Sequence, residues 1–166
     1  MKNKIVAIII AMIAIVNFSY AQKESPASVA AALTLKLAGF NNKLSGSAKI
    51  YVVGNDALAA ELKKGVGKPL GKATLAAVDA GADVPGAKYE VIVCGSAGKA
   101  GAVSGYAKKN KVLSITNIPS VLSKGISLGI GVGDDNKPKI LLNLTQSSEE
   151  GIDWNPAIMK VAETVK

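Results

Sequence analysis

The sequence predicts an α/β fold: a three-layer sandwich with a mostly parallel sheet and a C-terminal antiparallel hairpin. Three observations support this prediction. Segments rich in β-branched residues alternate with helical segments, an order typical of parallel sheets. The segment YEVIVCG is apolar almost throughout, as is a strand covered on both faces. Near the C-terminus, ISLGIGV and KPKILLNL flank the polar segment GDDNK, which is typical of a hairpin turn.

The first 21 residues have the composition of a secretory signal peptide. Lys2 and Lys4 precede an uncharged apolar run, and the small residues Ser19 and Ala21 occupy the places that a signal peptidase recognises. The alternative is a membrane anchor, which needs about 20 spanning residues, slightly more than this run offers. We therefore expect cleavage near Ala21 and one exported domain over residues 22–166.

The first half of that domain is expected to contain two helices and two strands. Pro26–Leu37 has apolar residues at four-residue spacing, which indicates a helix, and 48–54 is a β-branched strand segment. Asn55 or Asp56 can cap a second helix. The segment 72–78 is expected to be a short strand, before a loop rich in glycine and proline.

The second half continues the alternation and ends differently. The expected elements are a strand at 89–95, a helix at 97–109, a strand at 111–116, a turn or short helix at 118–124, hairpin strands at 126–132 and 137–144, a short helix at 145–151 and a final helix at 154–165. Asn155 would cap the final helix, and Pro156 would occupy its first position.

The charged residues argue against a nucleic-acid partner. All 20 basic residues are lysine, and the formal net charge is +8. Removing the leader takes away two lysines, which leaves 18 against 12 acidic residues, or about +6. No arginine is present for bidentate contacts to guanine, and aromatic residues make up only 4% of the chain, too few for base stacking.

The composition also excludes most catalytic devices. Without histidine and with one cysteine, the chain cannot form a Ser-His-Asp or Cys-His arrangement or an ordinary zinc site. Cys94 ends an apolar run and is expected to be a small buried side chain. Two carboxylate pairs, Asp134–Asp135 and Glu149–Glu150, are expected in a turn and on a helix surface. We predict no enzymatic activity, no metal and no cofactor.

A polar end to one strand is the candidate contact site. Thr116, Asn117 and Pro119 follow an apolar run, at the strand end where open α/β sheets place ligands. An alternative is that Asn117 closes a turn before the proline. In the next strand Gly129 and Gly131 share one face, which lets the final helix, or a ligand, approach closely. Asn143, at the end of the hairpin, completes this candidate set for ligand or partner contact.

The C-terminal half resembles the YfiR family, also called DUF4154. The segments LSITNIPSVLSKG, ISLGIGV, KILLNL, EEGI and AIMKVA follow the order and spacing of the family pattern, and VAAALTLKLAGF with AKIYVVG resembles its opening. The family usually has aspartate where this chain has Asn117, Gly-Phe where it has Ser120–Val121, and asparagine where it has Gly129. It also has a glycine at the position of Ile126.

The resemblance implies a non-enzymatic regulator in the periplasm, often dimeric. Such a protein would act by contact with the outer part of an inner-membrane signalling protein, either a diguanylate cyclase or a sensor kinase. Two alternatives stay open from the residues alone: a periplasmic small-molecule binding protein and a hydrolase that uses carboxylates.

Overall fold

The computed structural model describes residues 23–165, so the expected signal peptide and its cleavage point lie outside the described part. In chain order, the elements are β1 (Lys23–Glu24), α2 (Ala27–Ala38), β2 (Ser45–Val53), α3 (Asp56–Lys63), β3 (Pro69–Leu70), β4 (Lys72–Gly81), β5 (Val91–Cys94), the 3-10 helix η2 (Ala97–Lys99), α4 (Ala100–Asn110), β6 (Leu113–Thr116), the 3-10 helix η3 (Pro119–Lys124), β7 (Leu128–Val132), β8 (Pro138–Asn143), α5 (Leu144–Glu149), the 3-10 helix η4 (Pro156–Lys160) and β9 (Glu163–Val165).

Within this range nine strands form one mixed sheet, and the predicted fold class is confirmed. The strand order is β3-β4-β2-β5-β6-β7-β8-β9, with β1 added beside β7. Strands β4, β2, β5, β6 and β7 run parallel. The hairpin β7–β8 is antiparallel, as GDDNK predicted. The carboxyl ends of β5 and β6 therefore lie side by side, with Cys94 opposite Thr116.

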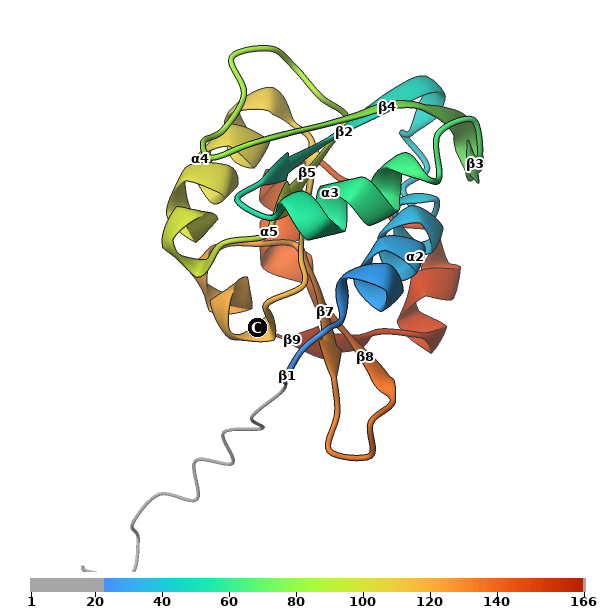
Figure 1. Ribbon diagram of the computed structural model, residues 1–166. Helices are drawn as coiled ribbons and strands as arrows, with labels where there is room; N and C mark the ends of the chain where they lie inside the picture. The colour runs from blue at the N-terminus through green and yellow to red at the C-terminus, as the bar shows by residue number, and fades with distance from the viewer. Residues whose placement is uncertain (1–22, 166) are drawn as a thin grey trace, which may run out of the picture.

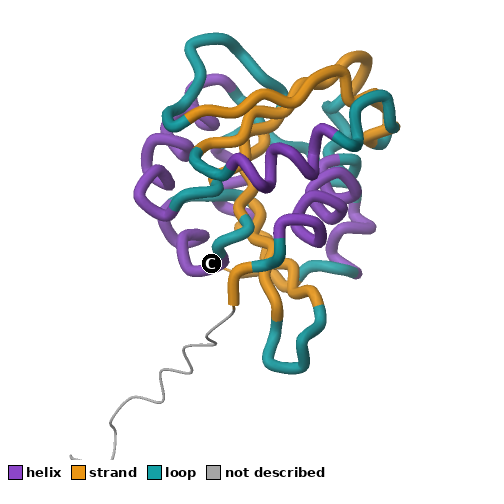
Figure 2. Tube along the Cα trace, viewed as in Figure 1, coloured by secondary structure: helices purple, strands orange, loops and turns teal. Residues whose placement is uncertain are grey.

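Two cores, one on each face of the sheet, make up the layered arrangement. Strand β5 contributes to both, because successive side chains of a strand point to opposite faces. Val91 and Val93 pack in the core with α2 and α3, whereas Ile92 and Cys94 pack with α4 and η3. Figure 2 shows helices on both sides of the strands. The apolar composition of YEVIVCG thus reflects a central strand without a solvent face.

Local signals explain several element boundaries. The Asn55 side chain accepts a hydrogen bond of 2.9 Å from the backbone N–H of Leu58, so Asn55 is the cap of α3. Helix α4 forms despite three glycines in its region and ends where Lys111 adopts a left-handed conformation with φ 55°. That conformation is the common helix stop, although glycine is its usual residue.

The predicted final helix over 154–165 is wrong. Asn155 caps one 3-10 turn by accepting from the N–H of Ala157 at 3.0 Å, and Pro156 occupies the first position as expected. The chain then leaves the helical path, and Glu163–Val165 pairs in parallel with β8. Two of these three residues are β-branched and fit a pleated surface, and the open edge of β8 satisfies their backbone groups.

The two ends of the described chain meet on the same hairpin. Lys23 and Glu24 pair with Val132 and Gly131 of β7, and β9 pairs with β8. Figure 1 shows the hairpin projecting beyond the helices, with β1 beside it at the foot of the molecule. The hairpin is therefore bordered by the first described strand on one side and by the last on the other.

Candidate functional site

Thr116 lies at the end of β6 and is completely buried. Its hydroxyl donates to the Cys94 carbonyl at 2.8 Å and accepts from the Ile118 N–H at 3.1 Å. The first bond joins β6 to β5, and the second closes the turn that precedes Pro119, which is itself buried. The turn that the sequence assigned to Asn117 as an alternative is thus made by its threonine neighbour.

Asn117 holds the N-terminal segment against the sheet. It is only 2% exposed, and its Nδ2 donates to Glu24 Oε1 at 2.7 Å. Its backbone carbonyl accepts from the N–H of Ser25 at 3.2 Å. The Asn117 Oδ1 and the Ser25 Oγ are both buried without a hydrogen-bond partner. Unpaired buried polar atoms are unfavourable, so this attachment is a weakly stabilised one.

The glycines of β7 admit two different neighbours. A Cβ placed on Gly129 would lie 3.2 Å from Leu122 Cδ1, so η3 packs closely there. This corrects the expectation that the final helix covers the glycine row. Gly131 lies opposite Glu24 of the added strand β1. Gly129 therefore permits a close contact with η3, whereas Gly131 pairs through its backbone with the N-terminal segment.

Asn143 lies at the opposite end of the hairpin from Gly131. Its Oδ1 accepts from the N–H of Gln146 at 2.9 Å and so caps the short helix α5. The structure therefore places Gly129 beside Thr116 through the β6–β7 pairing, with Asn117 and Pro119 following Thr116. Gly131 lies two residues further toward the hairpin tip, and Asn143 lies toward the base, beside Ser127.

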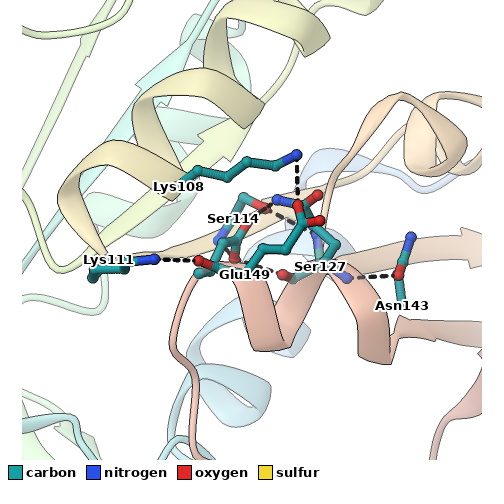
Figure 3. Close-up of polar contacts among 8 residues, drawn as sticks. Lys108, Lys111, Ser114, Ser127, Asn143 and Glu149 are labelled. Atoms are coloured by element: carbon teal, nitrogen blue, oxygen red, sulfur yellow. Dashed lines mark hydrogen bonds and ion pairs between the residues drawn. The ribbon is translucent and has the colours of Figure 1, made fainter.

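A buried carboxylate between β6, β7 and α5 was missed by the sequence reasoning. Glu150 has no exposed surface. Its oxygens accept from the Ser114 N–H at 3.0 Å, the Ser127 hydroxyl at 2.5 Å and Gln146 Nε2 at 3.1 Å. The Ser114 hydroxyl also donates to this carboxylate. Figure 3 shows Ser114 and Ser127 from this group of contacts, with Glu149 close by and facing Lys108.

Burial controls the titration of this group. Loss of hydration raises the pKa of Glu150 above its ordinary value, and the hydrogen bonds from Ser114, Ser127 and Gln146 oppose that effect. Its neighbour Glu149 lies on the helix surface, as the sequence predicted for both glutamates, and forms an exposed ion pair with Lys108 at 2.6 Å. The expected surface pair is thus one surface and one core residue.

Two serines in apolar segments were the only sequence feature that could have indicated a buried partner such as Glu150. Ser114 in β6 and Ser127 just before β7 are each fully buried, and buried hydroxyls require hydrogen-bond partners. The sequence shows both serines in apolar runs, but nothing in their spacing identifies Glu150 as the acceptor.

The remaining candidate chemistry is limited in the described range. Cys94 is buried, its Sγ donates to the Ser96 carbonyl at 3.3 Å, and burial raises the pKa of the thiol. Residues 23–165 contain no group of three or more His, Cys, Asp or Glu side chains that could hold a metal ion. The same residues contain no helix with the length and apolarity needed to span a bilayer.

Comparison with known families identifies the class of protein. The family model described as YfiR/HmsC-like, DUF4154, matches residues 27–163. The chain belongs to the YfiR/HmsC-like family. The match extends over most of the described chain, from the first residue of α2 to the first residue of β9.

A solved structure shares the fold of this YfiR/HmsC-like chain. The crystal structure of a conserved domain protein from Vibrio cholerae O1 biovar El Tor strain N16961 matches with a TM-score of 0.60 and 15% identity. The match covers 87% of this chain but 61% of that one, so the chain spans about three fifths of its length. A search of curated proteins found no match.

Proposed function

We propose that the chain is an exported regulator that binds the periplasmic part of an inner-membrane diguanylate cyclase or sensor kinase and controls it by contact. The observation that carries this proposal is the family match over residues 27–163. The α/β sandwich with its projecting hairpin supports it, because a projecting element can enter a partner surface without rearrangement of the core (Figure 1).

The contact surface in this proposal is the β7–β8 hairpin together with β1. The tip, residues 133–137, includes exposed Asp134, Asp135 and Lys137, and the last two form an ion pair at 3.3 Å. Five of the six candidate residues are buried at or near the base of this region. Their proposed role is therefore to position the hairpin and the N-terminal segment, whereas exposed neighbours make the contact.

The test is genetic and then biochemical. Deleting the gene should change the cellular cyclic di-GMP concentration or the phosphorylation of an envelope kinase, and the wild-type gene should reverse the change. Asp134→Lys should fail to reverse it. The matched control is Asp83→Lys, an equal charge reversal at an exposed site on the loop after β4, which should complement fully.

Purified protein separates contact from indirect effects. The mature chain should co-purify with the enzyme whose output changed, and the hairpin variant should not. If deletion alters neither signal and no envelope enzyme is retained, the proposal is refuted. Light scattering of the same material would show whether the chain is also a homodimer, as the family resemblance implies.

A small-molecule binding role is the second candidate, and one cleft favours it. Val84, Pro85 and Gly86 face α4 across a hollow of about 460 Å³, which falls within the about 300–1,000 Å³ range of ligand pockets. A specific ligand should raise the melting temperature, and Ala102→Trp, which fills the cleft, should abolish that rise. A shift that survives this substitution would exclude the cleft.

A further inference from the structure

A small basic hollow lies at the amino ends of the parallel strands, at the opposite edge of the sheet from Thr116. Its volume is about 160 Å³, and it opens between the segments that lead into β2, β5 and β6. Lys43, Lys88 and Lys111 line it, with Asn41 and Glu90. The three lysines come from three separate connections, so the fold, and not local sequence, gathers their charges.

These lysines lack the acidic partners found at other lysines of the chain. Within residues 23–165, no carboxylate lies at ion-pair distance from Lys43, Lys88 or Lys111. Glu90, the one acidic residue of the lining, uses its Oε2 to accept the N–H of Lys49 at 2.7 Å. Three cations against one anion leave the hollow with an excess of positive charge.

Backbone contacts hold two of the ammonium groups in place. Lys43 Nζ donates to the Gly151 carbonyl at 2.6 Å, and Lys111 Nζ donates to the Glu149 carbonyl at 2.7 Å. Figure 3 shows Lys111 reaching the end of α5. A Cβ on Gly151 would lie 3.9 Å from Lys43 Nζ and 3.6 Å from Lys111 Cδ, so both side chains converge there. Each ammonium carries three donors, and two remain for a ligand.

Lys111 brings the third charge to the hollow. Its φ of 55° is the left-handed stop of helix α4. An anion bound in the hollow would relieve the repulsion among the three lysines.

We propose that this hollow, the basic hollow of Lys43, Lys88 and Lys111, binds a phosphate group. Three lysines against one glutamate in the lining give an excess of positive charge, which suits a phosphate dianion better than the single charge of a carboxylate. Lysine binds phosphate as a point charge. The volume is below the about 300 Å³ at which pockets for drug-sized ligands begin, so the site takes a phosphate group and not a whole nucleotide.

Inorganic phosphate is the first probe, with the mature protein kept at constant ionic strength in sodium chloride. In ¹H–¹⁵N NMR spectra, saturable shifts are expected at the amides of 41–44, 88–90 and 111–112. Lys88→Ala is the test variant, because Lys88 forms no hydrogen bond or ion pair within the described chain that its loss would break. We expect at least tenfold weaker phosphate binding. Lys36→Ala, at an exposed lysine of α2, is the matched control and should bind normally.

Vesicles containing phosphatidylglycerol are the second probe, because a lipid headgroup carries the same phosphate chemistry. Flotation with these vesicles that requires Lys88, without a response to inorganic phosphate, would assign the site to a membrane surface. Binding of inorganic phosphate that requires Lys88 would assign it to the free anion. Three results would overturn the proposal. Lys88→Ala and Lys36→Ala could weaken binding equally, or succinate could bind more tightly than phosphate. The third is that inorganic phosphate causes no localised shifts and the vesicles show no flotation that requires Lys88.

Discussion

Replacing Glu150 with alanine should lower the free energy of unfolding by about 3–5 kcal/mol, because several buried donors lose their shared acceptor. The side chain has no exposed surface and accepts hydrogen bonds from four donors. Truncation leaves those donors buried without a partner, and each such donor costs about 1–3 kcal/mol. The two serine hydroxyls can rotate toward other acceptors, so the total cost in free energy stays below the sum for four unpaired donors.

The neighbouring residue supplies the control. Glu149 is also a glutamate and lies on the last turn of α5, but its carboxylate is exposed and pairs with Lys108. An exposed ion pair contributes about 0–1 kcal/mol, so Glu149→Ala should change stability by no more than that. The two variants differ by one position in the chain and remove the same side chain, which isolates the effect of burial.

Urea unfolding at pH 7, followed by circular dichroism, gives both free energies. The midpoint of Glu150→Ala should fall well below that of the wild type, with little change in the slope, because the native surface stays the same. If Glu150→Ala and Glu149→Ala lose equal amounts below about 1 kcal/mol, the buried network does not stabilise the fold and the reasoning fails.

Three further expectations follow from particular residues. Because burial raises the pKa of Glu150 above 4.5, the native protein holds the carboxyl proton of Glu150 more tightly than the unfolded protein does. This linkage stabilises the native fold fully at pH values below the ordinary pKa, and the stabilisation is lost as the pH rises through the pKa of the native state. Urea titrations of Glu150→Gln should lack this pH dependence. Gly125→Ala should destabilise by about 1–3 kcal/mol, because Gly125 has φ +91° and a Cβ would collide with the Ser104 hydroxyl; Gly101→Ala, with open space around it, should stabilise by about 0.4–1 kcal/mol, and thermal melts compare the two. The buried Cys94 thiol should react with an aromatic disulfide reagent only after unfolding; rapid labelling of the native protein at pH 7.5 would contradict its burial.

Much of the fold could be predicted because hydrophobic patterning is local. The central strands contain continuous apolar runs, and the helices that cover them begin at capping residues such as Asn55, which can be recognised in the sequence. The short strands β1, β3 and β9 could not be predicted, since two or three residues carry no periodicity. Their conformation depends on the open edges of β4, β7 and β8. The final helix was wrong for the same reason: an edge of the sheet outweighed a cap and a proline.

The site was harder to predict than the fold. Thr116 and Asn117 were correctly placed at a strand end, yet the partners that bury them, Cys94 and Glu24, come from distant parts of the chain. Glu150 was misplaced because two of its donor residues lie 36 and 23 residues away, one in β6 and one just before β7. Only three-dimensional packing brings such groups together, whereas sequence spacing describes neighbours along one element.

Because β1 borders β7 and β9 borders β8, the first and last strands of the described chain complete opposite sides of one ribbon. A protease that removes β1 or β9 would uncover a row of unsatisfied backbone groups on that ribbon. Bare edges of this kind recruit strands from other molecules. Intact β1 and β9 strands thus protect the protein from self-association.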